Sequence, residues 1–102
     1  MKELNVVEFR NVILEDKKTI VEMGAEWCCN CKDMKRILFN LEPEHPEMAF
    51  YSLDVGSNLA IADEYNIDEM PVLIAFKGGK EISRLCWSAG DDVASWLNFL
   101  TW

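Results

Sequence analysis

Two cysteines three positions apart, Cys28 and Cys31, are the residues of this chain best suited to chemistry. They follow an apolar run over residues 19–25 that is typical of a strand. The apolar residues after them recur with helical spacing: Met34, Ile37, Leu38 and Leu41. A cysteine at a strand-to-helix junction lies where free backbone N–H groups and the helix dipole favour an anion, which lowers a thiol pKa. A second thiol one turn along the helix can close a disulfide with the first, so the pattern predicts dithiol–disulfide exchange.

A carboxylic acid, Glu22, lies inside the apolar strand that precedes the cysteines, on the same side of the chain as Ile20. Burial disfavours the charged form of a carboxyl group, which raises its pKa and suits it to proton exchange near neutral pH. We therefore expect Glu22 to accept the proton of Cys31, directly or through a water. The alternative is a side chain that points to solvent from the end of the strand.

The elements that must hold these groups alternate between strand and helix patterns. Glycines 78 and 79 predict a turn between the last two strands, and Ser57 is a candidate helix cap. His45, between two prolines, is expected to be an exposed loop residue. We expect strands over residues 3–6, 19–24, 48–55, 72–76 and 80–87, and helices over residues 7–15, 28–42 and 58–65, with a last helix capped by Ser88 and Asp91. This order predicts one α/β domain over residues 1–102, a three-layer sandwich with a mixed sheet.

Composition narrows the class of protein. Half of the 102 residues are apolar, enough for one folded domain, and the net charge of −8 argues against binding to nucleic acid or to an anionic membrane. No apolar stretch approaches the about 20 residues of a membrane-spanning helix, and the first residues lack the apolar segment of a secretory signal. Three of the four cysteines fall within four residues, so they cannot staple distant loops together. We therefore expect a cytoplasmic protein.

The segment over residues 25–32, Ala-Glu-Trp-Cys-Cys-Asn-Cys-Lys, resembles the active-site segment of thioredoxins. Asp54 resembles part of their third-strand signature, and Met70-Pro71-Val72 with the glycine turn over residues 76–80 resembles their cis-proline segment. The resemblance extends from about residue 3 to residue 100, in order and in spacing. A lone Cys-x-x-Cys would be weak, because zinc ligands use the same spacing.

The resemblance implies a thioredoxin fold, an α/β/α sandwich that reduces protein disulfides without a bound cofactor or metal. Cys28 would be the exposed nucleophile and Cys31 the buried resolving thiol, and the two would form the redox-active disulfide. Substrate would contact Trp27, which is expected to pack against the active-site helix or in the core, and the cis Met70–Pro71 segment. The implied partners are disulfide-containing proteins and a thioredoxin reductase of the flavoprotein or ferredoxin-linked kind, and a monomer is expected.

Several residues depart from the thioredoxin pattern. Cys29 and Asn30 stand where thioredoxins have glycine and proline, and the added N–H of Asn30 leads to the hypothesis of a more oxidising pair. Phe50 replaces a lysine close to the buried acid, so we expect the Glu22 pKa to rise further. Trp87 replaces a small residue of the substrate groove and is expected to narrow it. Its neighbour Cys86 is expected to be an inert strand cysteine.

Two other functions stay open at the level of sequence. Cys28, Cys29 and Cys31 could hold Cu(I) or zinc in a soft-metal-binding module. Alternatively, the chain could be a redox-inert scaffold that uses the same surface for protein binding. A glutaredoxin is disfavoured, because Met70 precedes the proline and Lys80 follows the glycine pair.

Overall fold

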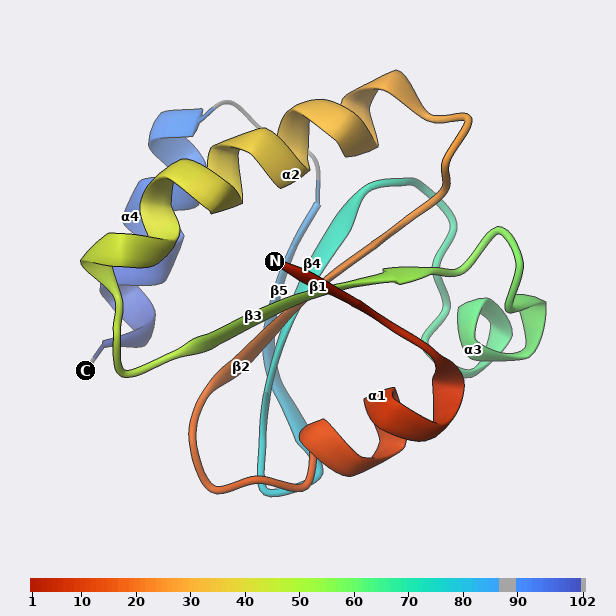
Figure 1. The fold of residues 1–102 in the computed structure, drawn as a ribbon, viewed down its shortest axis with the longest axis horizontal. Helices are drawn as coiled ribbons and strands as arrows, with labels where there is room; N and C mark the ends of the chain where they lie inside the picture. The colour runs from red at the N-terminus through yellow and green to blue at the C-terminus, as the bar shows by residue number, and fades with distance from the viewer. Residues whose placement is uncertain (87–89, 102) are drawn as a thin grey trace.

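The computed structural model describes residues 1–86 and 90–101, and within them five strands form one mixed sheet. The strands lie in the order β1 (Lys2–Leu4), β3 (Ala49–Asp54), β2 (Thr19–Gly24), β4 (Val72–Lys77) and β5 (Lys80–Cys86) (Figure 1). The first three are parallel to one another, and β4 and β5 are antiparallel to their neighbours. The central strand β2 is buried along its whole length, as the unbroken apolar run predicts.

Helices cover both faces of this sheet. Figure 1 shows α2 (Cys29–Leu41) and α4 (Gly90–Leu100) together on one side, and α1 (Val6–Val12) and α3 (Leu59–Glu64) on the other. The predicted three-layer α/β/α sandwich is confirmed. Among the described residues, no helix is long and apolar enough to cross a membrane.

Each face of the sheet has its own apolar core. On the α1 and α3 side, Phe9, Tyr65 and Phe76 meet edge to face, with ring centroids 5.6 to 5.8 Å apart. Such aromatic contacts add to the stability that burial alone supplies. On the α2 and α4 side, aliphatic and methionine side chains dominate: Ile20, Met34, Leu38, Met48, Leu73, Val93, Leu97 and Leu100.

The strand register explains how the active-site face is assembled. Glu22 of β2 lies between Ser52 of β3 and Leu73 of β4. Strand residues alternate between faces, so Glu22 shares the α2 side with Ile20, while Val21 and Met23 face α1. The acid is therefore held in the centre of the sheet, below the helix that carries the cysteines.

The structure corrects several local predictions. The first helix begins one residue earlier than expected, because Asn5 caps it in a reciprocal pair with Glu8, and it ends at Val12 rather than at residue 15. Ser57 does not cap α3, since its hydroxyl and amide both bind the Asp54 carboxylate. The predicted cap at Ser88 and the side chain of Asp91 lie outside the described residues.

The prediction that His45 is an exposed loop residue is wrong, because the residue is only 5% exposed. A short 3-10 turn, Glu42–Glu44, folds the loop back, and the His45 amide donates to the carbonyl of Glu42. The ring nitrogen Nδ1 lies 3.4 Å from a carboxylate oxygen of Glu47. Two prolines therefore shape a compact turn here rather than an open loop.

Candidate active site

Cys28 is the N-cap residue of α2. Its backbone is extended, and its sulfur accepts a hydrogen bond from the amide of Cys31 at 3.2 Å. A cap position is where a side-chain acceptor meets the free N–H groups and the positive end of the helix dipole. The Cys28 side chain is half-buried, so one side of the sulfur remains open to a partner.

Cys31 lies one turn along α2 and is only 1% exposed. Burial, the neighbouring Cys28 thiol and the nearby Glu22 carboxyl raise the pKa of Cys31 to about 12. All four cysteines are free, so the structure is that of the dithiol form. The two thiols of the predicted pair therefore differ in access to solvent, as a nucleophile and a resolving thiol require.

Glu22 is fully buried, which excludes the alternative of a side chain that points to solvent. Within the described part of the chain, neither carboxyl oxygen has a hydrogen-bond partner. Burial raises the pKa of Glu22 to about 7, and the charges of Glu3 and Asp54 act in the same direction. A buried carboxyl group that changes charge near neutral pH can take up and release a proton under cellular conditions.

Gly24, at the end of β2, is the point where the acid and the thiol meet. A Cβ atom at this position would lie 2.2 Å from Glu22 Oε2 and 2.6 Å from Cys31 Sγ. The two atoms are therefore close neighbours, within reach of a direct or water-mediated proton transfer. Gly24 is not among the residues predicted from the sequence, although a glycine within a buried strand often marks a close approach of this kind.

The segment before β4 closes the other side of the site. The Met70–Pro71 bond is cis, as the resemblance implies, and the Cys28 thiol donates a long hydrogen bond of 3.9 Å to the carbonyl oxygen of Met70. Pro71 is buried and Met70 half-buried. The structure thus brings Cys28, Cys31, Met70 and Glu22 together around the start of α2.

Trp27 is 74% exposed, which excludes a place in the core. Its packing against α2 stays a prediction. The indole nitrogen lies above the backbone of Gly56, 3.4 Å from where a Cβ would stand. A large, exposed aromatic ring beside Cys28 is suited to contact another protein.

The other two cysteines are more exposed to solvent than Cys28 and Cys31. Cys29, the first residue of α2, and Cys86, the last of β5, are both exposed. Across residues 1–86 and 90–101, no group of three or more His, Cys, Asp or Glu side chains is placed to hold a metal ion. Trp87, expected to narrow the substrate groove, lies outside the described residues.

The pKa of Glu22 is raised, in the direction expected from Phe50 standing in place of a lysine. Phe50 is indeed buried, in the apolar core on the α2 side. However, Lys35 of α2 supplies a positive charge that acts to lower the Glu22 pKa, and this is the largest influence after burial. The cation comes from the helix rather than from the strand, which a comparison of strand positions alone does not reveal.

Comparison with known proteins places the whole arrangement in one family. The Thioredoxin family model matches residues 1–98. Thioredoxin-1 of Saccharomyces cerevisiae is 33% identical over 78 residues, which cover 76% of each chain. Thioredoxin-2 of the same organism is 36% identical over 70 residues, which cover 69% of this chain and 67% of that protein.

Solved structures agree. The crystal structure of oxidised mitochondrial thioredoxin 3 from Saccharomyces cerevisiae has a TM-score of 0.86 at 28% identity, over 97% of this chain and 94% of that chain. A second chain, at 27% identity and a TM-score of 0.85, covers the same shares and belongs to a structure of the thiol-resolving mechanism in yeast mitochondrial 1-Cys peroxiredoxin via glutathione/thioredoxin systems.

Proposed function

Because this chain belongs to the thioredoxin family and is a thiol–disulfide oxidoreductase that reduces protein disulfides, we propose that Cys28 is its nucleophile and Cys31 its resolving thiol. One observation carries the assignment: the half-buried Cys28 sulfur caps α2, and the buried Cys31 donates its amide to that sulfur at 3.2 Å. A substrate can therefore reach the Cys28 thiol, whereas the Cys31 thiol is buried and is left to react with Cys28.

The reaction proceeds in two exchanges. The Cys28 thiolate attacks one sulfur of the substrate disulfide, and the other substrate sulfur leaves as a thiolate. Cys31 then loses its proton and attacks Cys28 Sγ, which forms the Cys28–Cys31 disulfide and releases the second substrate sulfur. Two electrons pass to the substrate. The second exchange is fast because the attacking sulfur is already held beside its target.

Glu22 accepts the proton that Cys31 loses in the second exchange. The pKa of the thiol, about 12, means that this proton does not leave unaided at neutral pH. The carboxyl group, with a pKa of about 7, is the buried base next to it across Gly24. Its uptake of the proton keeps a second negative charge from building up beside the sulfurs.

Trp27, Met70 and Pro71 form the surface that binds the substrate chain. Trp27 offers an exposed ring next to Cys28 in the chain, and the Met70 carbonyl lies 3.9 Å from the Cys28 sulfur. An extended substrate segment placed between them would present its disulfide to Cys28 and could pair with the backbone at Met70.

The partners follow from the chemistry. The oxidised chain needs a dithiol reductant, and a thioredoxin reductase, flavoprotein or ferredoxin-linked, is the class that fits; the chain itself then acts as a monomeric electron carrier without a cofactor. A peroxiredoxin is a candidate substrate, in line with the solved relative from that system. We place the chain in the cytoplasm; because one relative is a mitochondrial thioredoxin, microscopy of the tagged protein should test this against mitochondria.

Serine substitutions test the assignment. With insulin as the disulfide substrate, Cys28→Ser should abolish reduction, and Cys31→Ser should accumulate a mixed disulfide at Cys28 that mass spectrometry detects. Cys29→Ser is the matched control on the exposed turn of the same helix and should retain turnover. Full biological function of Cys28→Ser would instead support a redox-inert scaffold, and stoichiometric metal in the purified protein without disulfide reduction would support a soft-metal module.

A further inference from the structure

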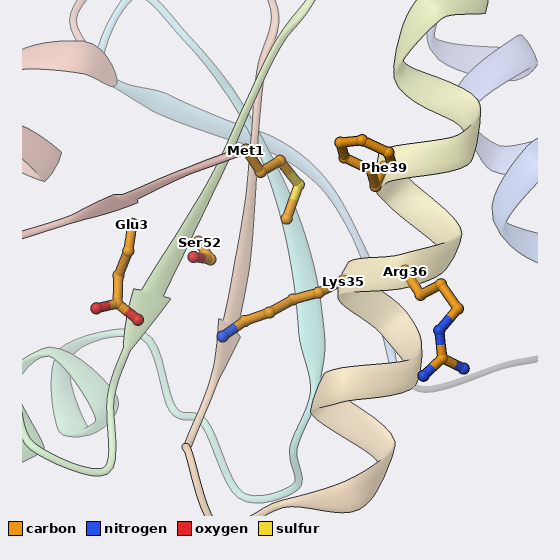
Figure 2. A pocket seen from close by; sticks show the side chains of 6 residues that line it. All are labelled: Met1, Glu3, Lys35, Arg36, Phe39 and Ser52. Carbon is orange, nitrogen blue, oxygen red and sulfur yellow. The ribbon is translucent and has the colours of Figure 1, made fainter.

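A cavity of about 430 Å³ opens between α2 and the β1–β3 side of the sheet. It is lined by Met1, Glu3, Lys35, Arg36, Phe39 and Ser52. Figure 2 shows Lys35 reaching from α2 across the strands, with its ammonium group directed toward Ser52 and Glu3, while Arg36 points away. Arg36 pairs instead with Asp33 on its own helix, at 3.4 Å. Of the two basic side chains that line the cavity, Lys35 is therefore the one that extends toward the sheet.

Ser52 connects the cavity to the buried acid. It is the register partner of Glu22 on the adjacent parallel strand, so the two side chains lie next to each other on the same face of the sheet. Ser52 lines the cavity, whereas Glu22 is fully buried and its oxygens have no hydrogen-bond partner among the described residues. A buried polar group of this kind calls for a physical explanation, and a role in proton transfer beside the cysteines is one.

The helix places Lys35 and Cys31 on the same side. The two residues are four positions apart, so they lie one above the other on the face of α2. Glu22 thus has a thiol and an ammonium group above it, both from one helix. The other charges that act on Glu22 are Glu3 from β1 and Asp54 from β3, and its neighbour on β4, Leu73, has none.

We propose that Lys35 is a positioning residue that acts through this cavity: it favours the carboxylate form of Glu22 before the resolving step and gives the proton taken from Cys31 a way to solvent past Ser52. This inference rests on the proton-acceptor role proposed above for Glu22. The proton passes from Cys31 to Glu22 and then to water, so no further reactant is required. Glu3, across the cavity, opposes Lys35 and limits its effect.

The charges of Lys35 and Glu3 affect the fraction of molecules in which Glu22 is a carboxylate. With a Glu22 pKa of about 7, about half of the molecules carry the carboxylate at neutral pH. Loss of the Lys35 charge should raise this pKa by about one unit, which leaves roughly a tenth of the molecules with a competent base at pH 7. Loss of the Glu3 charge should move the pKa in the opposite direction.

The test is a carboxyl titration of Glu22 by ¹³C NMR in the reduced protein, on Lys35→Met, Lys35→Arg and Glu3→Gln. We expect Lys35→Met to raise the Glu22 pKa by about one unit, Lys35→Arg to restore it, and Glu3→Gln to lower it. Lys32→Met is the matched control, because Lys32 is an exposed lysine on the same helix and does not line the cavity. It should leave the titration unchanged. An unchanged Glu22 titration in Lys35→Met, or the same shift in Lys32→Met, overturns the proposal.

A second readout separates this inference from the proton-acceptor role itself. The resolving step is followed by rapid mixing, as release of substrate thiol from the mixed disulfide, across a range of pH. In Lys35→Met its pH profile should shift upward by the same amount as the Glu22 titration. If Glu22→Gln resolves as fast as the wild type, the acceptor role fails even where the titration responds to Lys35. If Glu22→Gln is slow but Lys35→Met shifts neither curve, only the inference about Lys35 fails.

Discussion

The two faces of the central sheet are packed with different kinds of side chain. On the α1 and α3 side, β2 contributes Val21 and Met23 to a core closed by three aromatic rings. On the α2 side, the alternating residues of the same strand are Ile20, a buried glutamic acid and a glycine. One strand therefore stabilises the fold with one set of side chains and, with the other, carries the acid for which we propose a role in proton transfer.

The α2 face of β2 carries two residues that lower stability, Glu22 and Gly24. A carboxyl group in the centre of a sheet costs stability whenever it is ionised, because it has lost its hydration. A glycine in a strand packs nothing, and here its missing side chain leaves the space in which acid and thiol approach. Substitutions on the α1 side should change stability without changing the chemistry, and substitutions on the α2 side should change the chemistry.

The largest stability effect is expected on the face without chemistry. Phe9→Ala removes a fully buried ring from the contact with Tyr65 and Phe76 and should cost about 3–5 kcal/mol of unfolding free energy. Urea unfolding measures the loss, and disulfide reduction per folded molecule, measured at low temperature, should match the wild type. A large loss of turnover in the folded fraction would contradict the separation of the two faces.

The buried acid should make stability depend on pH. The pKa of Glu22 rises from 4.5 to about 7 on folding, so the folded state holds this proton more tightly than the unfolded state. Below pH 4.5, Glu22 is protonated in both states and its ionisation costs no stability. The free energy of unfolding falls as the pH rises from 4.5 to 7, and above pH 7 it is lower by about 3 kcal/mol. Urea unfolding from pH 4.5 to pH 8 should show Glu22→Gln gaining stability over the wild type as the pH rises.

The exposed Glu26 offers a matched control for this prediction. Glu26→Gln changes the same charge beside the same segment and should follow the wild type at every pH. A stability difference between Glu22→Gln and the wild type that does not vary with pH would contradict the burial argument.

Gly24→Ala should damage both properties at once. The added Cβ would stand 2.2 Å from Glu22 Oε2 and 2.6 Å from Cys31 Sγ, so one or both must move. Overpacking of this kind costs about 1–3 kcal/mol, and the displaced sulfur should slow the resolving step. Gly56→Ala, where the nearest atom lies at 3.0 Å, is the milder control. Equal resolving rates in Gly24→Ala and the wild type would argue against the close approach.

The smallest stability effect is expected at the exposed edge of the site. Trp27 is 74% exposed, so Trp27→Ala should change the unfolding free energy by less than about 0.5 kcal/mol. If the ring binds substrate, KM for a protein disulfide should rise, while the rate with a small, readily reduced disulfide such as 5,5′-dithiobis(2-nitrobenzoic acid) should hardly change. Equal losses with both substrates would place Trp27 in the chemistry rather than in binding.

Much of this architecture can be predicted from local patterns. The strand–turn–helix around the cysteines, the apolar run of β4 and the burial of Glu22 follow from periodicity, because each depends on neighbours a few residues away. The family resemblance supplies the cis segment at Met70 and its place beside Cys28, which no local pattern contains. The boundaries of α1 and the cap of α3 needed the actual hydrogen bonds of Asn5 and Asp54.

What escaped prediction depends on how distant elements are packed. The effect of Lys35 on Glu22 comes from a helix that packs over the strand, and a strand-by-strand comparison assigns that role to the position of Phe50. His45 is buried because a 3-10 turn folds back on itself, which prolines and charges alone do not indicate. Trp27 is exposed, and its indole nitrogen approaches Gly56, a residue 29 positions away whose proximity no local pattern indicates.

The central claim is that electrons leave through Cys28 and Cys31 and through no other pair. The direct measurement is one turnover of the reduced protein with an excess of protein disulfide, followed by alkylation of free thiols and peptide mass spectrometry. The account predicts a Cys28–Cys31 bridge with Cys29 and Cys86 alkylated. A bridge that includes Cys29 or Cys86, or four alkylated cysteines after the substrate is reduced, would contradict it.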